Sequence, residues 1–237
     1  MSEWFDNKGA PPEITPGGSV IHRYDRTVWS PNRIGFTDES IARFSETRNE
    51  VYKRFFGEVR GLFRELRPLI PRVDVHAYSR RDQYGRDVYT VVTSGMSDLE
   101  MLVPPGDDVP RRVELIFYCS EPKPEYVETL RWLAHFPHDQ KTCIGSGHTV
   151  TNGNPPAAFW GSSILNTILF IPPIVKRDLA LPHELTLAGE PVYFLWVVPL
   201  TTPESDLKLA QGVDAILDLF QRNRHPHVFD PNRMSYV

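Results

Sequence analysis

Two long apolar runs constrain the fold of this chain most strongly. SILNTILFIPP spans residues 163–173 and PVYFLWVVPL spans residues 191–200, and apolar side chains occupy nearly every position of both. A strand that is apolar on both faces has to be covered on both faces, because either face would otherwise expose hydrocarbon to water. We therefore expect both runs to be interior strands of a sheet.

An amphipathic pattern near the N-terminus predicts a long helix. Thr37 is a suitable N-cap, and Asp38 and Glu39 would lie beside the positive end of the helix dipole. Apolar residues then recur at spacings of three, four and seven, namely Ile41, Phe44, Val51, Phe55, Val59, Leu62 and Leu66. This stripe predicts a core-facing helix that runs to Leu66 and ends before Pro68.

The remaining segments alternate between strand and helix patterns. Strands are predicted at 73–78, 88–97 and 112–120, a turn at 82–85, and helices at 124–136 and from 203 to about 220. This order predicts an α+β fold, an α/β sandwich in which helices pack on a mixed, largely antiparallel sheet. We expect one domain over residues 37–237.

Residues 1–36 form a proline- and glycine-rich leader in this prediction. The segment contains four prolines and the pair Gly17–Gly18, a composition that is typical of irregular structure. It also contains Trp4, Phe5, Tyr24 and Trp29, and disordered tails are usually poor in aromatic residues. We therefore expect parts of the leader to dock on the domain.

Charge and cysteine content narrow the class of protein. The formal net charge is −4, with 26 basic and 30 acidic residues well mixed along the chain, which argues against nucleic acid as a partner. No run approaches the roughly 18 apolar residues of a membrane span. Only Cys119 and Cys143 are present, and the N-terminus lacks the pattern of a signal peptide, so we expect a cytoplasmic protein without a membrane partner.

The stretch HFPHDQKTCIGSGHTV, residues 135–150, raises the question of a metal or thiol site. His135, His138, Cys143 and His148 are all possible zinc ligands, and Cys143 with a histidine is a possible nucleophile. However, Pro137 is expected to push Phe136 out of the helical region, and no CxxC pair anchors a metal site. We predict no metal, no cofactor and no catalytic residue here.

Two polar turns are the remaining candidates for binding. TSGMSD, residues 93–98, follows a strong strand, and GHTVTNGNPP, residues 147–156, contains an Asn-Gly turn signal. Such turns often satisfy only their own backbone, but they also present hydroxyls and amides to ligands. We take Ser94, Asp98, His148 and Asn152 as the candidate binding residues, with a cleft between the two loops as the alternative to a structural role.

Several strings together resemble the suppressor of fused domain. These are VYTVVTSGMSDLEM, RVELIFYCSEP, WLAHFPHDQKTCIGSGHTVTNG, SSILNTILFIPPI, VYFLWVVPLTTPESDLKLAQGVDAILDLF and HVFDPNR, which cover roughly residues 73–233. The resemblance implies an α/β sandwich with no known catalytic activity. It also implies that His138 and Cys143 lie in a connection between helix and strand and have no recognised role.

The resemblance further indicates what the chain does. The animal member is a cytoplasmic negative regulator of Hedgehog signalling that grips a transcription-factor peptide with the help of a second, C-terminal domain. The present sequence ends soon after the DPNR string, so we do not expect that clamping role. Single-domain relatives occur in bacteria, and several of them are inferred to be immunity proteins that neutralise toxin effectors. We therefore expect a non-catalytic protein-binding domain whose partner is a protein, with a toxin effector as the most specific version; the alternative is a small-ligand binder or an uncharacterised enzyme.

Overall fold

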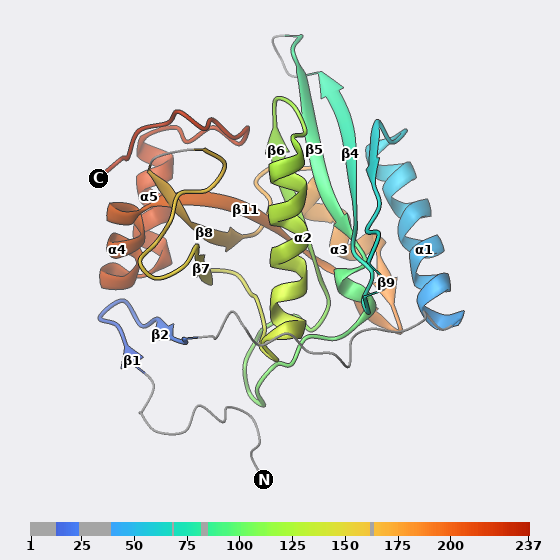
Figure 1. The fold of residues 1–237 in the computed structure, drawn as a ribbon, viewed down its shortest axis with the longest axis horizontal. Coiled ribbons are helices and arrows are strands. Elements are labelled where there is room, and N and C mark those ends of the chain that lie inside the picture. Colours follow the sequence, from blue (N-terminus) through green and yellow to red (C-terminus); the bar gives the residue numbers. More distant parts are fainter. Residues whose placement is uncertain (1–12, 24–38, 68, 82–84, 162–163) are drawn as a thin grey trace.

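The computed structural model describes residues 13–23, 39–67, 69–81, 85–161 and 164–237 (Figure 1). Its helices are α1 (Glu39–Phe56), α2 (Pro124–Asp139), α3 (Leu181–Glu184), α4 (Thr202–Gln211) and α5 (Val213–Arg222), with short 3-10 helices η2 (Met96–Asp98) and η3 (Asp178–Ala180). Its strands are β1 (Glu13–Ile14), β2 (Val20–Ile21), β3 (Gly61–Phe63), β4 (Asp74–Arg81), β5 (Asp87–Ser94), β6 (Val113–Cys119), β7 (Thr149–Thr151), β8 (Leu165–Ile171), β9 (Thr186–Leu187), β10 (Glu190–Pro191) and β11 (Tyr193–Thr201).

A seven-stranded sheet organises the molecule. The strand order is β3-β4-β5-β6-β11-β8-β7, and every neighbouring pair is antiparallel except β6 and β11, which run parallel. The mixed, largely antiparallel sheet that the sequence predicts is therefore confirmed. The two long apolar runs form β8 and β11, which pair with each other inside the sheet.

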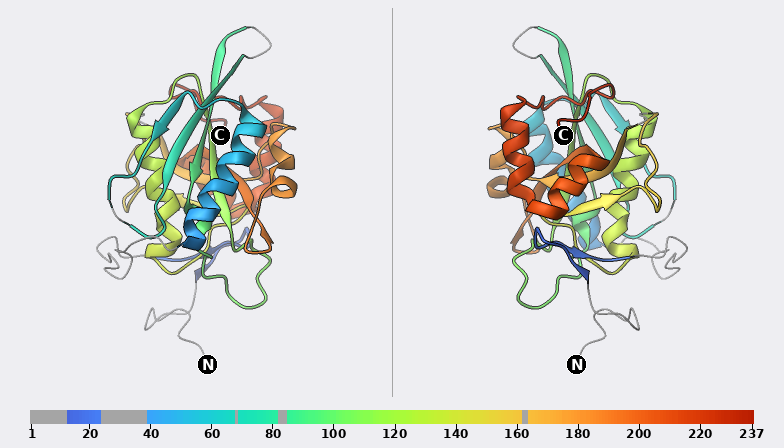
Figure 2. Two further views of the ribbon diagram at one scale, coloured as in Figure 1. Left: turned by 90° about the vertical axis from the view of Figure 1, so that its right-hand side faces the viewer. Right: turned by 90° about the vertical axis from the view of Figure 1, so that its left-hand side faces the viewer.

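Helices cover both faces of this sheet, so the α/β sandwich is also confirmed. On one face, α2 packs against the strand residues Leu115, Phe117 and Val197. On the other face, α1, α3 and α5 pack against Ile116, Tyr118 and their neighbours. Figure 2 shows α2 and α1 on opposite sides of the strands. Successive residues of β6 thus enter different cores, because side chains alternate across a strand.

The first long helix is shorter than the sequence predicts. It ends at Phe56, and Gly57 follows with a φ of 86°, a conformation that favours glycine. The chain then forms the edge strand β3, in which Leu62 is 43% exposed, and Leu66 beyond it is 94% exposed. The prediction of helix up to Leu66 was wrong, because a helical spacing continued by chance past a glycine that ends the helix. The proposed cap at Thr37 lies outside the described residues.

Pro137 does not end the second helix, contrary to the prediction. The helix α2 continues to Asp139 with Pro137 inside its last turn. A proline there removes one backbone hydrogen bond, to the carbonyl four residues earlier. The next turn recovers bonding, because the Gln140 N–H donates to the Phe136 carbonyl and the Thr142 N–H donates to the Pro137 carbonyl. Pro137 is itself buried, and this burial favours the continued helix.

Part of the predicted leader contacts the domain. The β1–β2 hairpin lies beside α4, where the Gly17 N–H donates to the Leu209 carbonyl at 2.8 Å and the Lys208 ammonium donates to Ser19 Oγ at 2.8 Å. The aromatic residues on which docking was predicted, Trp4, Phe5, Tyr24 and Trp29, lie outside the described residues. None of the helices described is both long and apolar enough to cross a membrane.

Gly95 offers a direct test of the tight junction after β5. It has a φ of 132°, and a Cβ at this position would overlap the carbonyl oxygen of Arg72. We expect Gly95→Ala to lower the free energy of unfolding by about 3 kcal/mol or more, because backbone strain and overlap add. The matched control is Gly106→Ala, with a φ of 94° in open space, which should cost roughly 1–2 kcal/mol from strain alone. Urea unfolding measures both, and equal losses would contradict the assignment.

Candidate functional site

The structure brings two of the four candidate residues together, in a buried polar network. Arg48 of α1 donates from Nε to Ser94 Oγ at 2.9 Å and from Nη1 to Asp98 Oδ1 at 2.5 Å. All three side chains are buried, and the Arg48 side chain is 2% exposed. Burial raises the pKa of Asp98 to about 6, although the guanidinium of Arg48 opposes this change. The TSGMSD turn therefore anchors a helix to the end of a strand.

Glu114 of β6 is the centre of this network, and sequence reasoning missed it. Its carboxylate accepts hydrogen bonds from Thr93 Oγ1 at 2.6 Å, from the Gly95 N–H at 2.9 Å, and from both the N–H and Oγ of Ser97, at 3.1 and 2.6 Å. Arg48 Nε lies 3.8 Å from the same carboxylate. The sequence did contain a signal for this site, because Glu114 is the single charged residue in the apolar run VELIFYC. A buried carboxylate is costly unless hydrogen bonds satisfy its oxygens.

The side chains of His148 and Asn152 bond to backbone groups of residues close to them in the chain. The Gly145 N–H donates to His148 Nδ1 at 3.2 Å, and burial lowers the pKa of His148, so the ring is neutral at pH 7. Asn152 Nδ2 donates to the Ala158 carbonyl at 3.1 Å and so shapes the loop that follows β7. These bonds are separate from those that Ser94 and Asp98 make with α1. These contacts therefore do not place the four candidate residues around a single cleft.

The histidines and cysteine of residues 135–150 point to different partners. His135 Nε2 lies 2.8 Å from Glu65 Oε1, and His138 Nε2 lies 3.1 Å from the Met96 carbonyl oxygen. Burial raises the pKa of the Cys143 thiol, which reduces its thiolate fraction at neutral pH. Within the described ranges, no three His, Cys, Asp or Glu side chains are grouped so as to hold a metal ion.

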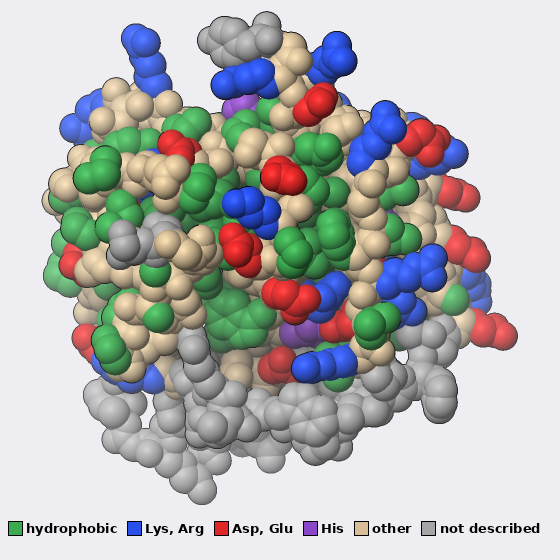
Figure 3. Space-filling model, turned by 45° about the horizontal axis from the view of Figure 1, so that its top comes forward, with side chains coloured by type: hydrophobic (Ala, Val, Ile, Leu, Met, Phe, Trp, Pro, Cys, Tyr) green, Lys and Arg blue, Asp and Glu red, His purple; other side chains and the backbone are tan. Residues whose placement is uncertain are grey.

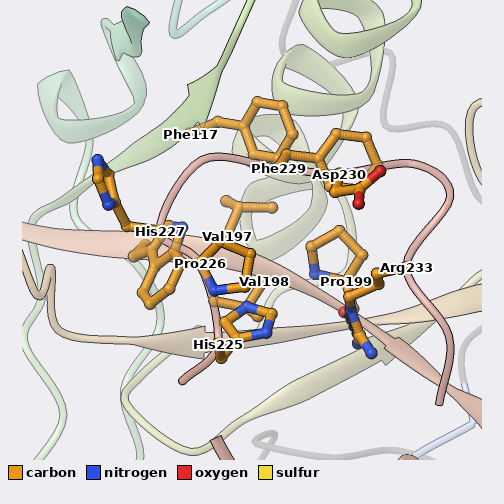
Figure 4. A pocket seen from close by; sticks show the side chains of 11 residues that line it. Phe117, Val197, Val198, Pro199, His225, Pro226, His227, Phe229, Asp230 and Arg233 are labelled. Atoms are coloured by element: carbon orange, nitrogen blue, oxygen red, sulfur yellow. Dashed lines mark hydrogen bonds between the residues drawn. The ribbon is translucent and has the colours of Figure 1, made fainter. Parts of the chain in front are cut away.

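The C-terminal segment encloses a small cavity against β11 (Figure 4). The cavity measures about 10 Å³, near the lower limit for one water molecule. His225, Phe229 and Arg233 line it together with Phe117 of β6. The segment is held by the buried ion pair between Arg233 and Glu204, with an N–O distance of 2.6 Å. We conclude that this cavity is a packing void and that the HVFDPNR string has a structural role.

A larger hollow opens to solvent beside α2. It is a depression of about 390 Å³ between the outward face of α2 and the loop 152–160. Its floor is aromatic, with Trp132, Phe159 and Trp160, and its rim includes Glu125 and Glu128. Of the four candidate residues, only Asn152 is among its lining residues. Figure 3 shows apolar side chains on a face where acidic and basic groups are interspersed around them.

The protein is thus an α/β sandwich. The buried polar network of Arg48, Asp98 and Glu114 belongs to its structural framework. The model of the suppressor of fused protein family matches residues 71–234. This chain belongs to the suppressor of fused family.

Solved structures agree with this assignment at the level of the fold. A suppressor of fused homologue from Neisseria gonorrhoeae FA 1090 is similar with a TM-score of 0.60 at 19% identity, over 83% of this chain and 98% of that chain. A chain of the Sufu–Fu complex is similar with a TM-score of 0.57 at 11% identity, over 83% of this chain and 92% of that one. Drosophila Suppressor of Fused gives a TM-score of 0.53 at 11% identity, over 88% of this chain and 54% of that one. No curated protein matched the chain.

His225 gives the folded state a specific pH dependence. Its ring stacks on Phe220 with a centroid distance of 4.1 Å and bonds to the Tyr236 hydroxyl at 3.0 Å. Burial, assisted by the positive charge of Arg233, lowers its pKa from 6.5 to about 4. The unfolded chain therefore takes up this proton at a higher pH than the folded chain does. Acid thus favours unfolding between pH 6.5 and 4.

We expect His225→Phe to remove this dependence while keeping the stack on Phe220. Between pH 7 and pH 4.5 the wild-type protein should lose about 2 kcal/mol more unfolding free energy than the variant, a figure reduced from the full shift for partial solvent screening. Urea denaturation at the two pH values measures the difference. His183→Phe, at an exposed position in α3, is the control and should behave as the wild type does. Identical pH dependence in His225→Phe and the wild type would refute the assignment.

Proposed function

We propose that this chain is a non-catalytic protein-binding domain that acts by surface complementarity in the cytoplasm. The proposal rests on one observation, that the polar side chains of the 93–98 turn form hydrogen bonds inside the molecule. Ser94 and Asp98, the best candidates for ligand contacts, are committed to Arg48 inside the molecule. The two hollows described above are a void of the size of one water and a depression open to solvent. A shallow surface suits a macromolecular partner better than a metabolite, which usually needs a pocket that encloses it.

Family membership supports the same proposal. One solved structure with this fold is a complex of Sufu with Fu, so a protein of this fold has been captured with a protein partner. We extend this to a protein partner of the present chain. In the most specific version, the chain is a bacterial immunity protein and its partner is a toxin effector. Its formal net charge of −4 would suit a basic effector surface.

The test is purification of the tagged chain from the cells that produce it, followed by identification and titration of any protein that co-purifies. We expect a stoichiometric partner with a submicromolar Kd, which corresponds to about −8 kcal/mol or better. If the partner is a toxin, co-expression of this chain should restore the growth of cells that the partner alone arrests. Growth arrest that persists despite complex formation would reject the immunity role but keep protein binding.

The competing function is catalysis or binding of a small ligand at the 93–98 and 147–152 loops. Ser94→Ala and His148→Ala distinguish it, because we expect both variants to bind the partner as the wild type does. Turnover of a metabolite that either substitution abolishes, in protein that remains folded, would overturn the proposal.

A further inference from the structure

The depression beside α2 has a floor that is fixed before any partner arrives. The ring of Phe159 contacts both Trp132 and Trp160, with centroid distances of 6.5 Å and 5.5 Å. The indole Nε1 of Trp160 donates to Thr129 Oγ1 at 2.7 Å. Beneath them, Phe229 lies 4.8 Å from the Trp160 ring and joins it to the main core. A preformed aromatic floor lowers the entropy lost on binding.

Carboxylates stand at the rim of this floor. Glu125 and Glu128 lie one helical turn apart on the exposed face of α2, and both line the depression. The Glu128 side chain is 72% exposed and contacts Arg131 at 3.0 Å. Arg131 is itself 14% exposed and donates its other nitrogens to the carbonyls of Phe63 and Val73. Across the described ranges, no ion pair of the Glu125 carboxylate is present. Among the described residues, the pair of Glu128 with Arg131 leaves the Glu125 carboxylate as the uncompensated negative charge of the rim.

The combination of an aromatic floor and an acidic rim matches one side-chain chemistry. An arginine can lay its planar guanidinium on an indole face while its N–H groups donate to a carboxylate, and it is weakly hydrated compared with lysine. An acidic side chain or a nucleic-acid phosphate would meet the two carboxylates and be repelled. A purely apolar ligand would leave the rim without a role.

We propose that this depression receives an arginine side chain presented by a segment of the protein partner. The inference rests on the proposed function, since it names the surface and the partner chemistry through which that function acts. The guanidinium would lie over Trp132 or Trp160 with Glu125 and Glu128 at its edge, and the aliphatic stem would pack on Phe159. Such a buried Arg–Trp contact is typical of the few residues that dominate an interface.

The experiment uses the complete chain and a defined probe. The peptide acetyl-Ser-Leu-Arg-Leu-Ser-amide is titrated into the ¹⁵N-labelled protein, and the indole N–H signals of Trp132 and Trp160 are followed by NMR. The matched peptide carries citrulline, which has the shape of arginine without its charge. We expect saturable shifts of these two signals with the arginine peptide and binding about tenfold weaker with citrulline. Equal affinity of both peptides, or no shift with either, would overturn the proposal.

Charge-reversal variants test whether the arginine peptide binds at this depression. Glu125→Lys with Glu128→Lys should weaken the arginine peptide by about tenfold or more, because two attractive contacts become repulsive. The control is Glu46→Lys with Glu50→Lys, which makes the same charge change at exposed positions of α1 on the other side of the sheet and should leave the affinity unchanged. Equal loss in both double variants would mean that only net charge matters, and would refute the site.

The same variants separate this inference from the proposed function. If a protein partner is found and Glu125→Lys with Glu128→Lys binds it as tightly as the wild type does, the proposed function stands and the inference fails. If the peptide binds as expected but no protein partner exists, the site is real and the proposed function fails. A partner whose affinity falls at least tenfold in this variant, and not in the α1 control, supports both.

Discussion

The buried carboxylate of Glu114 is the interaction on which the arrangement of this molecule depends. It lies fully buried on β6, in the middle of the sheet, and accepts hydrogen bonds from Thr93 of β5, from Gly95, and from Ser97 of η2. Arg48 of α1 lies against the same carboxylate and against Asp98 of the turn. One charged network thus fixes two strands, a turn and a helix at one end of the sheet. The carboxylates of Asp98 and Glu114 share the single guanidinium of Arg48, and hydrogen bonds satisfy the Glu114 oxygens, which is the condition under which buried charges are tolerated.

This network also divides the polar groups of the protein into those that hold the fold together and those that remain on the surface. Because the polar groups at the strand end are used internally, the surface that we propose for recognition lies elsewhere, on the outside of α2 and the loop 152–160. That surface is joined to the core through the ring contact between Trp160 and Phe229, so the core also supports the proposed binding surface. Such a division allows a surface to change without loss of the fold beneath it.

The elements that the sequence predicted correctly were those with a strong local cause. The apolar runs of β8 and β11 require cover on both faces, and Pro124 begins α2 as expected. The errors came where a local pattern competed with longer-range packing. A helical spacing ran on past Gly57, and Pro137 proved compatible with the last turn of a helix that is buried along one side.

The candidate site was less accessible to sequence reasoning. Ser94 and Asp98 were recognised as a turn with polar side chains, but Arg48, their partner, is 46 and 50 residues away in the chain. No spacing rule connects positions so far apart, and only the sheet brings them together. The aromatic depression escaped notice for the same reason, since Trp132 and Trp160 belong to segments that meet only in the folded protein.

The most direct test of this account is the free energy of unfolding of Glu114→Gln, measured by urea denaturation beside Glu121→Gln, an exposed control on the loop after β6. The amide would place a donor where the native carboxylate accepts, and it would leave Arg48 with less compensation. We predict a loss of about 3–5 kcal/mol for Glu114→Gln and less than about 0.5 kcal/mol for the control. A Glu114→Gln protein as stable as the control would contradict the claim that this buried charge holds the structure together.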